Sequence, residues 1–382
     1  MQKHTANHLN RSANLLALAG FAMIPGAVSG QDQSAAGEAA IEEASEVLIQ
    51  RKLSDRLGRW RVNAKVGFNI SASFSGLGSF PAQTAPGAAA GAGDRFYDDG
   101  FNRVDASGIP DGNTWFWAYS DASQLGVVGA TPFVNMNSST VLADGAISGV
   151  NSGVSPGLEI NREWEMNRNE KSTWGFLGGI GYTRVETEDN TTVFATESRR
   201  TDSFDTTGAV IPVAPFTGTA AGPHPRIDNA PTTSVTALFA NGATVGGTRE
   251  VQANVVDFRL GPYWNTQLGE STRLELNGGF MGALVMSEFS VNESTTVLGM
   301  SPTLQPGVSA TQVSNQSSSD SGFLAGAFVG ANLQYELNPS TALLLGAQYQ
   351  YLPEFDQSLG ARRAVLEMDA SVYVTAGLAF SF

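Results

Sequence analysis

The chain of 382 residues contains no cysteine and three histidines, and 15% of its residues are charged. Without cysteine it forms no disulfide and offers neither a thiol nucleophile nor a thiolate ligand for a metal. Soluble globular domains usually carry about 25% charged residues, whereas a disordered chain has fewer apolar residues than the 42% found here. The composition therefore favours a folded protein that meets two apolar environments, with polar loops between them.

The sequence also lacks an apolar run that could cross a membrane as a helix, which takes about 20 residues. The stretch Leu15–Ile24 is shorter than this; it follows Lys3 and Arg11 and precedes the small residues 27–30. A positive region, a short apolar core and small residues for cleavage are typical of an export signal. We therefore expect residues 1–30 to be a signal peptide.

Basic residues are scarce relative to acidic ones, and the net charge is −14. This acidity argues against nucleic acid as a partner, because phosphate binding needs clustered Lys and Arg. Residues 31–57 include the Ala- and Glu-rich stretch Ala35–Leu53, which has no proline. We expect a short periplasmic helix there, and a solvated linker is equally compatible with this composition.

What the sequence does have is strict alternation of apolar and polar side chains, which marks a strand with two different faces. It is clearest over Arg59–Gly76, where the apolar face runs from Trp60 to Phe74, and over the last segment, where it runs from Leu366 to Phe382. Average strands have about 5–6 residues, and roughly 10 cross a membrane at a tilt. Further alternating segments cover 156–166, 174–184, 255–265, 274–288, 323–337 and 341–352.

Short and long connections alternate between these segments. The short ones are 167–172, 268–271 and 337–341, and the long polar ones are 79–154, 187–248, 291–320 and 354–363. Membrane barrels combine short periplasmic turns with long outer loops and an even strand number. The sequence thus predicts an all-β, transmembrane, antiparallel up-and-down β-barrel over residues 58–382, with about eight strands. The segment Asn113–Ser120 is compatible with a short hairpin above the membrane. It is also compatible with a further strand paired with Thr131–Val141, which would give ten strands.

Aromatic residues on the apolar face fall at one level of this topology, as expected of a girdle at the membrane interface. The predicted girdle consists of Trp60, Trp164, Trp174, Trp264, Tyr335, Phe380 and Phe382.

The opposite faces carry charges of both signs, which we expect to point into the lumen. They are Arg59, Arg61, Lys65, Glu159, Glu163, Glu165, Asp257, Arg259, Arg273, Glu275, Glu367 and Asp369. We expect Arg61 to lie close to Glu165, and Lys65 close to Asn161 and Glu163. Because the interior of an eight-stranded barrel is just wide enough for side chains, the prediction is an ion-paired, plugged lumen. The alternative is a narrow channel whose lining carries charges of both signs. An apolar lining would favour a transporter, and the only apolar bulk on the predicted lumen faces is Leu177, Phe328 and Leu344.

Candidates for chemistry are few. His224, the one histidine beyond the signal, has no nucleophile motif beside it, so an enzyme is not expected and no cofactor is implied. A weak calcium candidate is formed by the oxygen-bearing residues Asp98, Asp99, Asn102 and Asp105. Their spacing differs from that of an EF-hand, and turn formation accounts for them equally well.

Over Arg59–Phe382, the alternating strands and the terminal Phe resemble those of small OmpA/OmpX/OmpW-like outer-membrane barrels. The resemblance implies the outer membrane of a diderm bacterium, contact with outer-membrane lipid, and recognition of Phe382 by the outer-membrane assembly machinery. Long loops on a rigid scaffold favour a non-enzymatic structural or surface-interaction role, in which the loops contact an unknown extracellular partner. The alternative is a narrow channel or transporter for small or apolar molecules, and a surface hydrolase ranks third.

Overall fold

The computed structural model describes residues 58–83, 93–109, 111–300 and 308–381. The predicted signal peptide (1–30), the predicted helix or linker (31–57) and Phe382 lie outside the described residues. Within them the chain forms twenty strands, one short helix, α2 (Val104–Ser107), and one 3-10 turn, η1 (Ala122–Gln124). None of the described helices is long and apolar enough to cross a membrane. The prediction of an all-β, antiparallel fold is confirmed.

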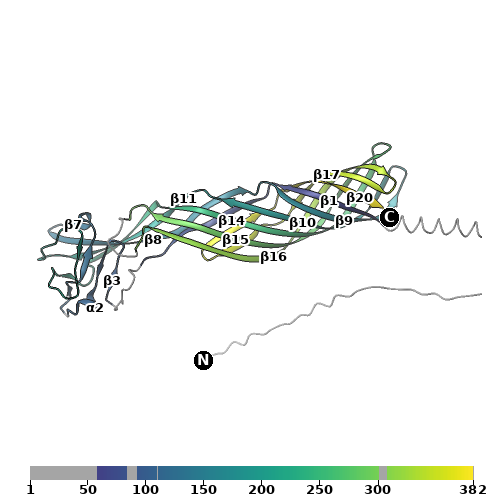
Figure 1. Ribbon diagram of the computed structural model, residues 1–382. Coiled ribbons are helices and arrows are strands. Elements are labelled where there is room, and N and C mark those ends of the chain that lie inside the picture. The colour runs from purple at the N-terminus through teal and green to yellow at the C-terminus, as the bar shows by residue number, and fades with distance from the viewer. Residues whose placement is uncertain (1–57, 84–92, 110, 301–307, 382) are drawn as a thin grey trace, which may run out of the picture. The chain divides into compact units, whose positions relative to one another are not determined.

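Eight of the strands pair in a closed circuit. In order around it they are β1 (Arg59–Phe68), β9 (Ser155–Arg168), β10 (Ser172–Asp189), β14 (Thr233–Gln267), β15 (Thr272–Val297), β16 (Thr311–Asn338), β17 (Thr341–Tyr351) and β20 (Ser371–Ser381), which pairs again with β1. Short turns join β9 to β10, β14 to β15 and β16 to β17, at the predicted positions. Figure 1 shows these strands side by side, with the chain's C-terminus at the turn end. A closed circuit leaves no unpaired edge.

The sheet continues past this circuit. The added strands are β2 (Ser71–Phe80), β8 (Thr131–Asn151), β11 (Val193–Asp205), β18 (Phe355–Leu359) and β19 (Arg362–Glu367). They extend β1, β9, β10, β17 and β20, whereas β14, β15 and β16 run through without interruption. The expected outer loops 79–154, 187–248 and 291–320 are therefore wrong in large part, because much of each is strand. β14 alone has 35 residues, where about 9–11 suffice to cross a membrane.

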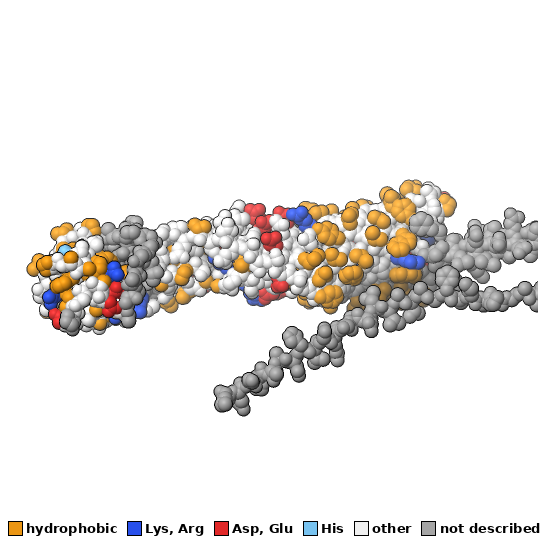
Figure 2. All heavy atoms as spheres, turned by 60° about the horizontal axis from the view of Figure 1, so that its bottom comes forward, with side chains coloured by type: hydrophobic (Ala, Val, Ile, Leu, Met, Phe, Trp, Pro, Cys, Tyr) orange, Lys and Arg blue, Asp and Glu red, His pale blue; other side chains and the backbone are white. Residues whose placement is uncertain are grey.

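The two faces of the barrel wall exchange character along its length. In β14, Arg259 is buried inside and Phe258 is exposed outside, whereas further along Ala253 is buried inside and Asn254 is exposed outside. An apolar exterior matches lipid, and a polar exterior matches water. Figure 2 shows this exterior as an apolar belt, then a zone of charged side chains, then a largely polar surface. We call the belted length the membrane part and the remainder the outer part.

Four strands make this exchange through a break in the chain. The break after β1 is at Asn69, whose φ of 60° is tolerated by asparagine better than by most residues. Its side-chain amide donates to the Ala370 carbonyl at 2.8 Å, which joins it to the break between β19 and β20. The other breaks lie at 152–154 and 352–354.

Because of these breaks, some side chains that were predicted to face the lipid point into the interior instead. Ile70 and Phe74, predicted to face lipid, are each 1% exposed and lie in the interior. Leu366 and Met368 are likewise buried inside, so Leu366–Phe382 is two strands rather than one. A break that shifts the strand by one position exchanges its faces while every second residue stays apolar.

A separate set of short strands, which we call the cap, gathers at the far end of the outer part. It contains β3 (Arg95–Phe96), β4 (Gly100–Asn102), β5 (Asn113–Thr114), β6 (Trp117–Tyr119), β12 (Phe216–Thr217) and β13 (Ile227–Asp228). β6 pairs with β4 and β12, and β7 (Leu125–Val128) pairs with β8. The alternative pairing of Asn113–Ser120 with Thr131–Val141, which would have given ten strands, is therefore wrong. The core of the cap combines Trp117 and Tyr119 with Phe204 of β11.

Candidate functional site

The interior of the membrane part is built around Arg61, which is 1% exposed. Its guanidinium forms ion pairs with Glu163 of β9 and Glu275 of β15. Glu275 also accepts hydrogen bonds from the side-chain amides of Asn277 at 2.7 Å and Gln334 at 2.9 Å. A buried carboxylate needs several such donors to offset its lost hydration. This arrangement ties together strands on opposite sides of the lumen.

A second cluster lies further along the lumen. The Lys65 ammonium is 2.6 Å from Asp257, and the Arg259 guanidinium is 2.8 Å from Asp257 and 2.7 Å from Glu159. Glu159 also accepts from the Asn63 amide at 2.8 Å. All these groups are at most 5% exposed, so the lumen here is a cross-linked set of charges.

The predicted neighbours of Arg61 and Lys65 are wrong in detail. Arg61 lies opposite Asn161 in the sheet and pairs with Glu163, while Lys65 pairs with Asp257. Glu165 instead pairs with Arg168 at 2.6 Å, at the turn. The register between neighbouring strands is fixed when the barrel closes. The local sequence therefore does not predict which side chains meet across the lumen.

The other predicted lumen charges lie at the mouth or outside. At the turn end, Arg59 donates to Gln334 at 2.7 Å and Arg273 pairs with Glu336 at 3.0 Å. Glu367 and Asp369 do not line the lumen, because the break after β19 turns them outward. Glu367 accepts there from Ser71 at 2.8 Å and Ser73 at 2.6 Å, and Asp369 is exposed.

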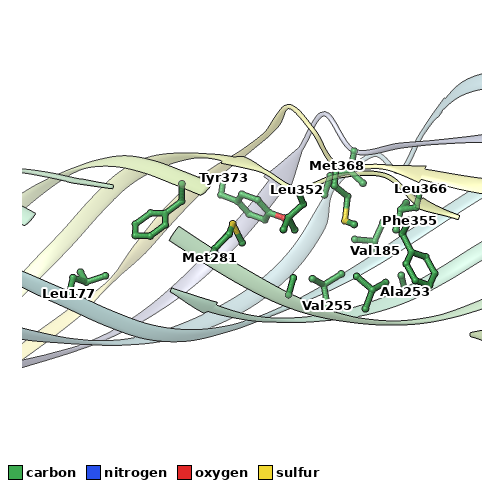
Figure 3. Close-up of a cluster of buried hydrophobic side chains, with 14 of the residues drawn as sticks. Leu177, Val185, Ala253, Val255, Met281, Leu352, Phe355, Leu366, Met368 and Tyr373 are labelled. Carbon is green, nitrogen blue, oxygen red and sulfur yellow. The ribbon is translucent and has the colours of Figure 1, made fainter. Parts of the chain in front are cut away.

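At the turn end the lumen opens into a polar cavity of about 220 Å³ among Arg59, Glu163 and Arg273, and little free volume remains beyond it. The cavity beside Arg61, Glu159 and Arg259 measures about 10 Å³, near the lower limit of about 10–15 Å³ for one water. Beyond it the interior is mainly apolar, and Figure 3 shows Tyr373, Met281 and Leu352 among the side chains that fill it. The prediction of little apolar bulk beyond Leu177, Phe328 and Leu344 is therefore wrong, because the interior of the outer part is a hydrophobic core.

One buried charge cluster was missed by sequence reasoning. In the outer part, Arg249 is fully buried and lies 2.7 Å from Glu293 and 2.8 Å from Asp189. Arg362 of β19 reaches the other oxygen of Glu293 at 2.7 Å. Arg249 lies next to a segment that the sequence assigned to a loop, so its inward position was not predicted.

Residues 97–99 fasten the cap to the outer part. Asp98 accepts the Ser139 N–H at 2.6 Å, and Asp99 accepts the Asn137 N–H at 2.8 Å, both on β8. The Tyr97 hydroxyl donates to Asp202 of β11 at 2.7 Å. A polar cavity of about 300 Å³ adjoins these carboxylates.

The calcium candidate is not assembled as predicted. Asp98 and Asp99 are bound to β8, Asp105 accepts the Gly93 N–H at 2.8 Å, and Asn102 donates to the Asp228 carbonyl at 2.9 Å. Among the described residues, no three His, Cys, Asp or Glu side chains form a group suited to a metal ion. These residues therefore act in the structure as cap and turn contacts.

The buried junction gives a pH dependence. Burial raises the pKa of Asp98 to about 6, and Asp99 and Glu197 add to this, while the hydrogen bond from Ser139 opposes it. A raised acid pKa means that the folded state prefers the proton. The stabilisation of the folded state by protonated Asp98 is complete below the pKa of the unfolded chain, about 4. It is lost as the pH rises through the folded-state pKa of about 6.

We therefore expect the cap to be less stable at pH 8 than at pH 4, with up to about 3 kcal/mol of this difference due to Asp98. In Asp98→Asn this share should disappear. Urea unfolding followed by tryptophan fluorescence at both pH values measures it, with Asp320→Asn, at an exposed carboxylate of β16, as the control. Equal pH dependence in wild type and Asp98→Asn would contradict the assignment.

His224 lies in the cap beside the ring of Phe216, and its Nε2 is 3.2 Å from the Thr219 hydroxyl.

The tryptophans of the predicted girdle are outward and 37–47% exposed, and Tyr335 is 52% exposed. Trp60 lies opposite Phe380, and Trp174 opposite Trp264, so these rings share one level. Phe382 lies outside the described residues, so its recognition by the assembly machinery stays a prediction.

The belt above this level is formed by outward apolar side chains such as Ile180, Phe258 and Leu333, which are 45–55% exposed. A backbone that crosses a bilayer must satisfy all its hydrogen bonds internally, which a closed barrel does. A closed barrel with an outward apolar belt and an aromatic girdle is the arrangement of outer-membrane proteins. The protein is thus a transmembrane β-barrel of the outer membrane.

No protein-family model and no curated protein matches the chain. Solved structures show loose similarity. Ail, the attachment invasion locus protein of Yersinia pestis, is 9% identical with a TM-score of 0.24, over 85% of this chain and 99% of that one. Neisserial surface protein A is 10% identical with a TM-score of 0.26, over 85% of this chain and 99% of that one. The outer membrane protease OmpT from Escherichia coli is 9% identical with a TM-score of 0.26, over 84% of this chain and 97% of that one.

Proposed function

We propose that this protein is a non-enzymatic outer-membrane anchor that presents its cap beyond the membrane surface, in a structural or surface-interaction role. The observation that carries this is the interior, which is filled by ion pairs in the membrane part and by a hydrophobic core in the outer part. A filled barrel of this length provides a rigid support and leaves little volume for a passing solute. The transmembrane barrel consists, in this proposal, of the eight strands of the closed circuit.

The cap is the proposed interaction surface. Functional contacts commonly lie on connections held by a rigid scaffold, and several apolar side chains here are open to solvent. Val127 and Val128 of β7, which pairs with β8 beside the cap, are 66% and 74% exposed, and Val210 and Val213 are 86% and 90% exposed. Exposed apolar side chains beyond the membrane favour contact with a partner.

The competing proposal of a narrow channel is tested by conductance. We expect purified protein in planar bilayers to show no steady single-channel openings, because the cavity among the lumen charges is close to the size of one water. A porin reconstituted in the same bilayers serves as the positive control. Steady openings of the wild-type protein that scale with salt concentration would overturn the anchor proposal in favour of the channel.

A further inference from the structure

The lipid-facing surface is hollowed where β1, β9 and β10 meet. A groove of about 610 Å³ lies there, among Trp60, Ile160, Trp164, Gly178, Ile180 and Tyr182. Its volume falls within the range of about 300–1,000 Å³ found for small-molecule sites. Its lining is almost entirely apolar, so it suits an acyl chain better than a polar solute.

The hollow exists because Gly178 has no side chain. Gly178 lies directly opposite Arg162, and Arg162 lies directly opposite Trp60, so these three form one row across the strands. A Cβ on Gly178 would lie 2.8 Å from the indole ring of Trp164. The absence of this atom lets the indole lie close to the sheet and leaves an open floor beyond it.

Arg162 is the unusual residue of this surface. The basic side chains of Arg61, Lys65 and Arg259 in the same region face the lumen, whereas Arg162 shares the lipid-facing side of β9 with Ile160 and Trp164. A cation on the lipid side is costly near the bilayer centre and tolerated at headgroup level. The Arg162 guanidinium carbon is 5.2 Å from the Trp60 ring centroid and 5.5 Å from that of Trp164, which holds it at the girdle.

We propose that this groove is a specific binding site for one phospholipid molecule. Arg162 pairs with the lipid phosphate at the level of the tryptophan girdle, since a guanidinium matches the oxygens of a phosphate in charge and geometry. One acyl chain lies on the open floor along Gly178, Ile180 and Tyr182, towards the centre of the membrane. The site belongs to the leaflet at the turn end of the barrel.

The test is native mass spectrometry of the full chain in detergent, titrated with phosphatidylglycerol. We expect one tightly bound lipid, and at least tenfold weaker binding in Arg162→Gln and in Gly178→Leu, which fills the floor. Arg162→Lys should keep more binding than Arg162→Gln. Two matched controls should bind as wild type. Arg168→Gln removes a cation at the same end, and Gly282→Leu fills another lipid-facing glycine that lies under an aromatic ring, that of Phe323.

Other outcomes separate the alternatives. Equal binding to wild type, Arg162→Gln and Gly178→Leu overturns the proposal. Equally tight binding of diacylglycerol, which lacks the phosphate, also overturns it, and so does competition by inorganic phosphate, which would indicate a simple anion site. If the chain formed a dimer and added lipid did not dissociate it, the groove would be assigned to a second copy of the chain instead. If the variants melt in detergent at the same temperature as the wild type, their weaker lipid binding is not caused by unfolding.

Discussion

Replacement of Arg61 by leucine is expected to destabilise the folded barrel by about 3–5 kcal/mol. The substitution leaves Glu163 and Glu275 without their shared cation, and Glu275 is 0% exposed. Removing one partner of a buried ion pair costs more than the pair contributes, because the remaining charge stays out of water. Asn277 and Gln334 continue to donate to Glu275, which keeps the loss within this range.

Urea unfolding in lipid vesicles measures this loss, with Arg168→Leu as the matched control. Arg168 pairs with Glu165 at the exposed turn, and exposed pairs contribute about 0–1 kcal/mol. The double variant Arg61→Leu/Glu275→Leu should recover part of the stability, since it removes the carboxylate as well. A single variant Arg61→Leu that unfolds at the same urea concentration as Arg168→Leu would show that the lumen charges do not hold the barrel together.

Replacement of Trp117 by alanine is expected to loosen the cap by about 3–5 kcal/mol while the barrel stays folded. Trp117 is fully buried, and its ring lies 5.7 Å from that of Tyr119 and 4.7 Å from that of Phe216. Its indole N–H donates to the Pro225 carbonyl at 2.7 Å. Alanine removes all three contacts and leaves a cavity at the centre of the cap.

Hydrogen exchange resolved by peptide separates the two parts of the molecule. Protection should fall in 95–120 and 216–228 and stay unchanged in the membrane part. Trp115→Ala is the control, because Trp115 is half-buried and its N–H bonds to Ala220 at the edge of the cap. If Trp117→Ala lowered protection in β14 and β15 as well, the cap would be part of the barrel's cooperative unit.

One sheet here serves two solvents. In the membrane part the exterior faces hydrocarbon, so polar side chains turn inward and must neutralise one another, as Lys65, Asp257 and Arg259 do. In the outer part the exterior faces water, so the interior becomes a hydrophobic core in which Phe74 stacks on Phe289 at 5.8 Å. The interior is filled in both parts, by ion pairs in the first and by apolar side chains in the second.

The sequence by itself determined the alternation of side chains, and with it the antiparallel strands, the three short turns and the level of Trp60 and Trp264. These follow from local chemistry, because a strand between two environments repeats every second residue. The tertiary structure decided which solvent each face meets: Ile70 and Leu366 turn inward after breaks that a period of two does not reveal. It also decided the partners of Arg61 and Lys65, because the stagger of strands is set when the sheet closes on itself.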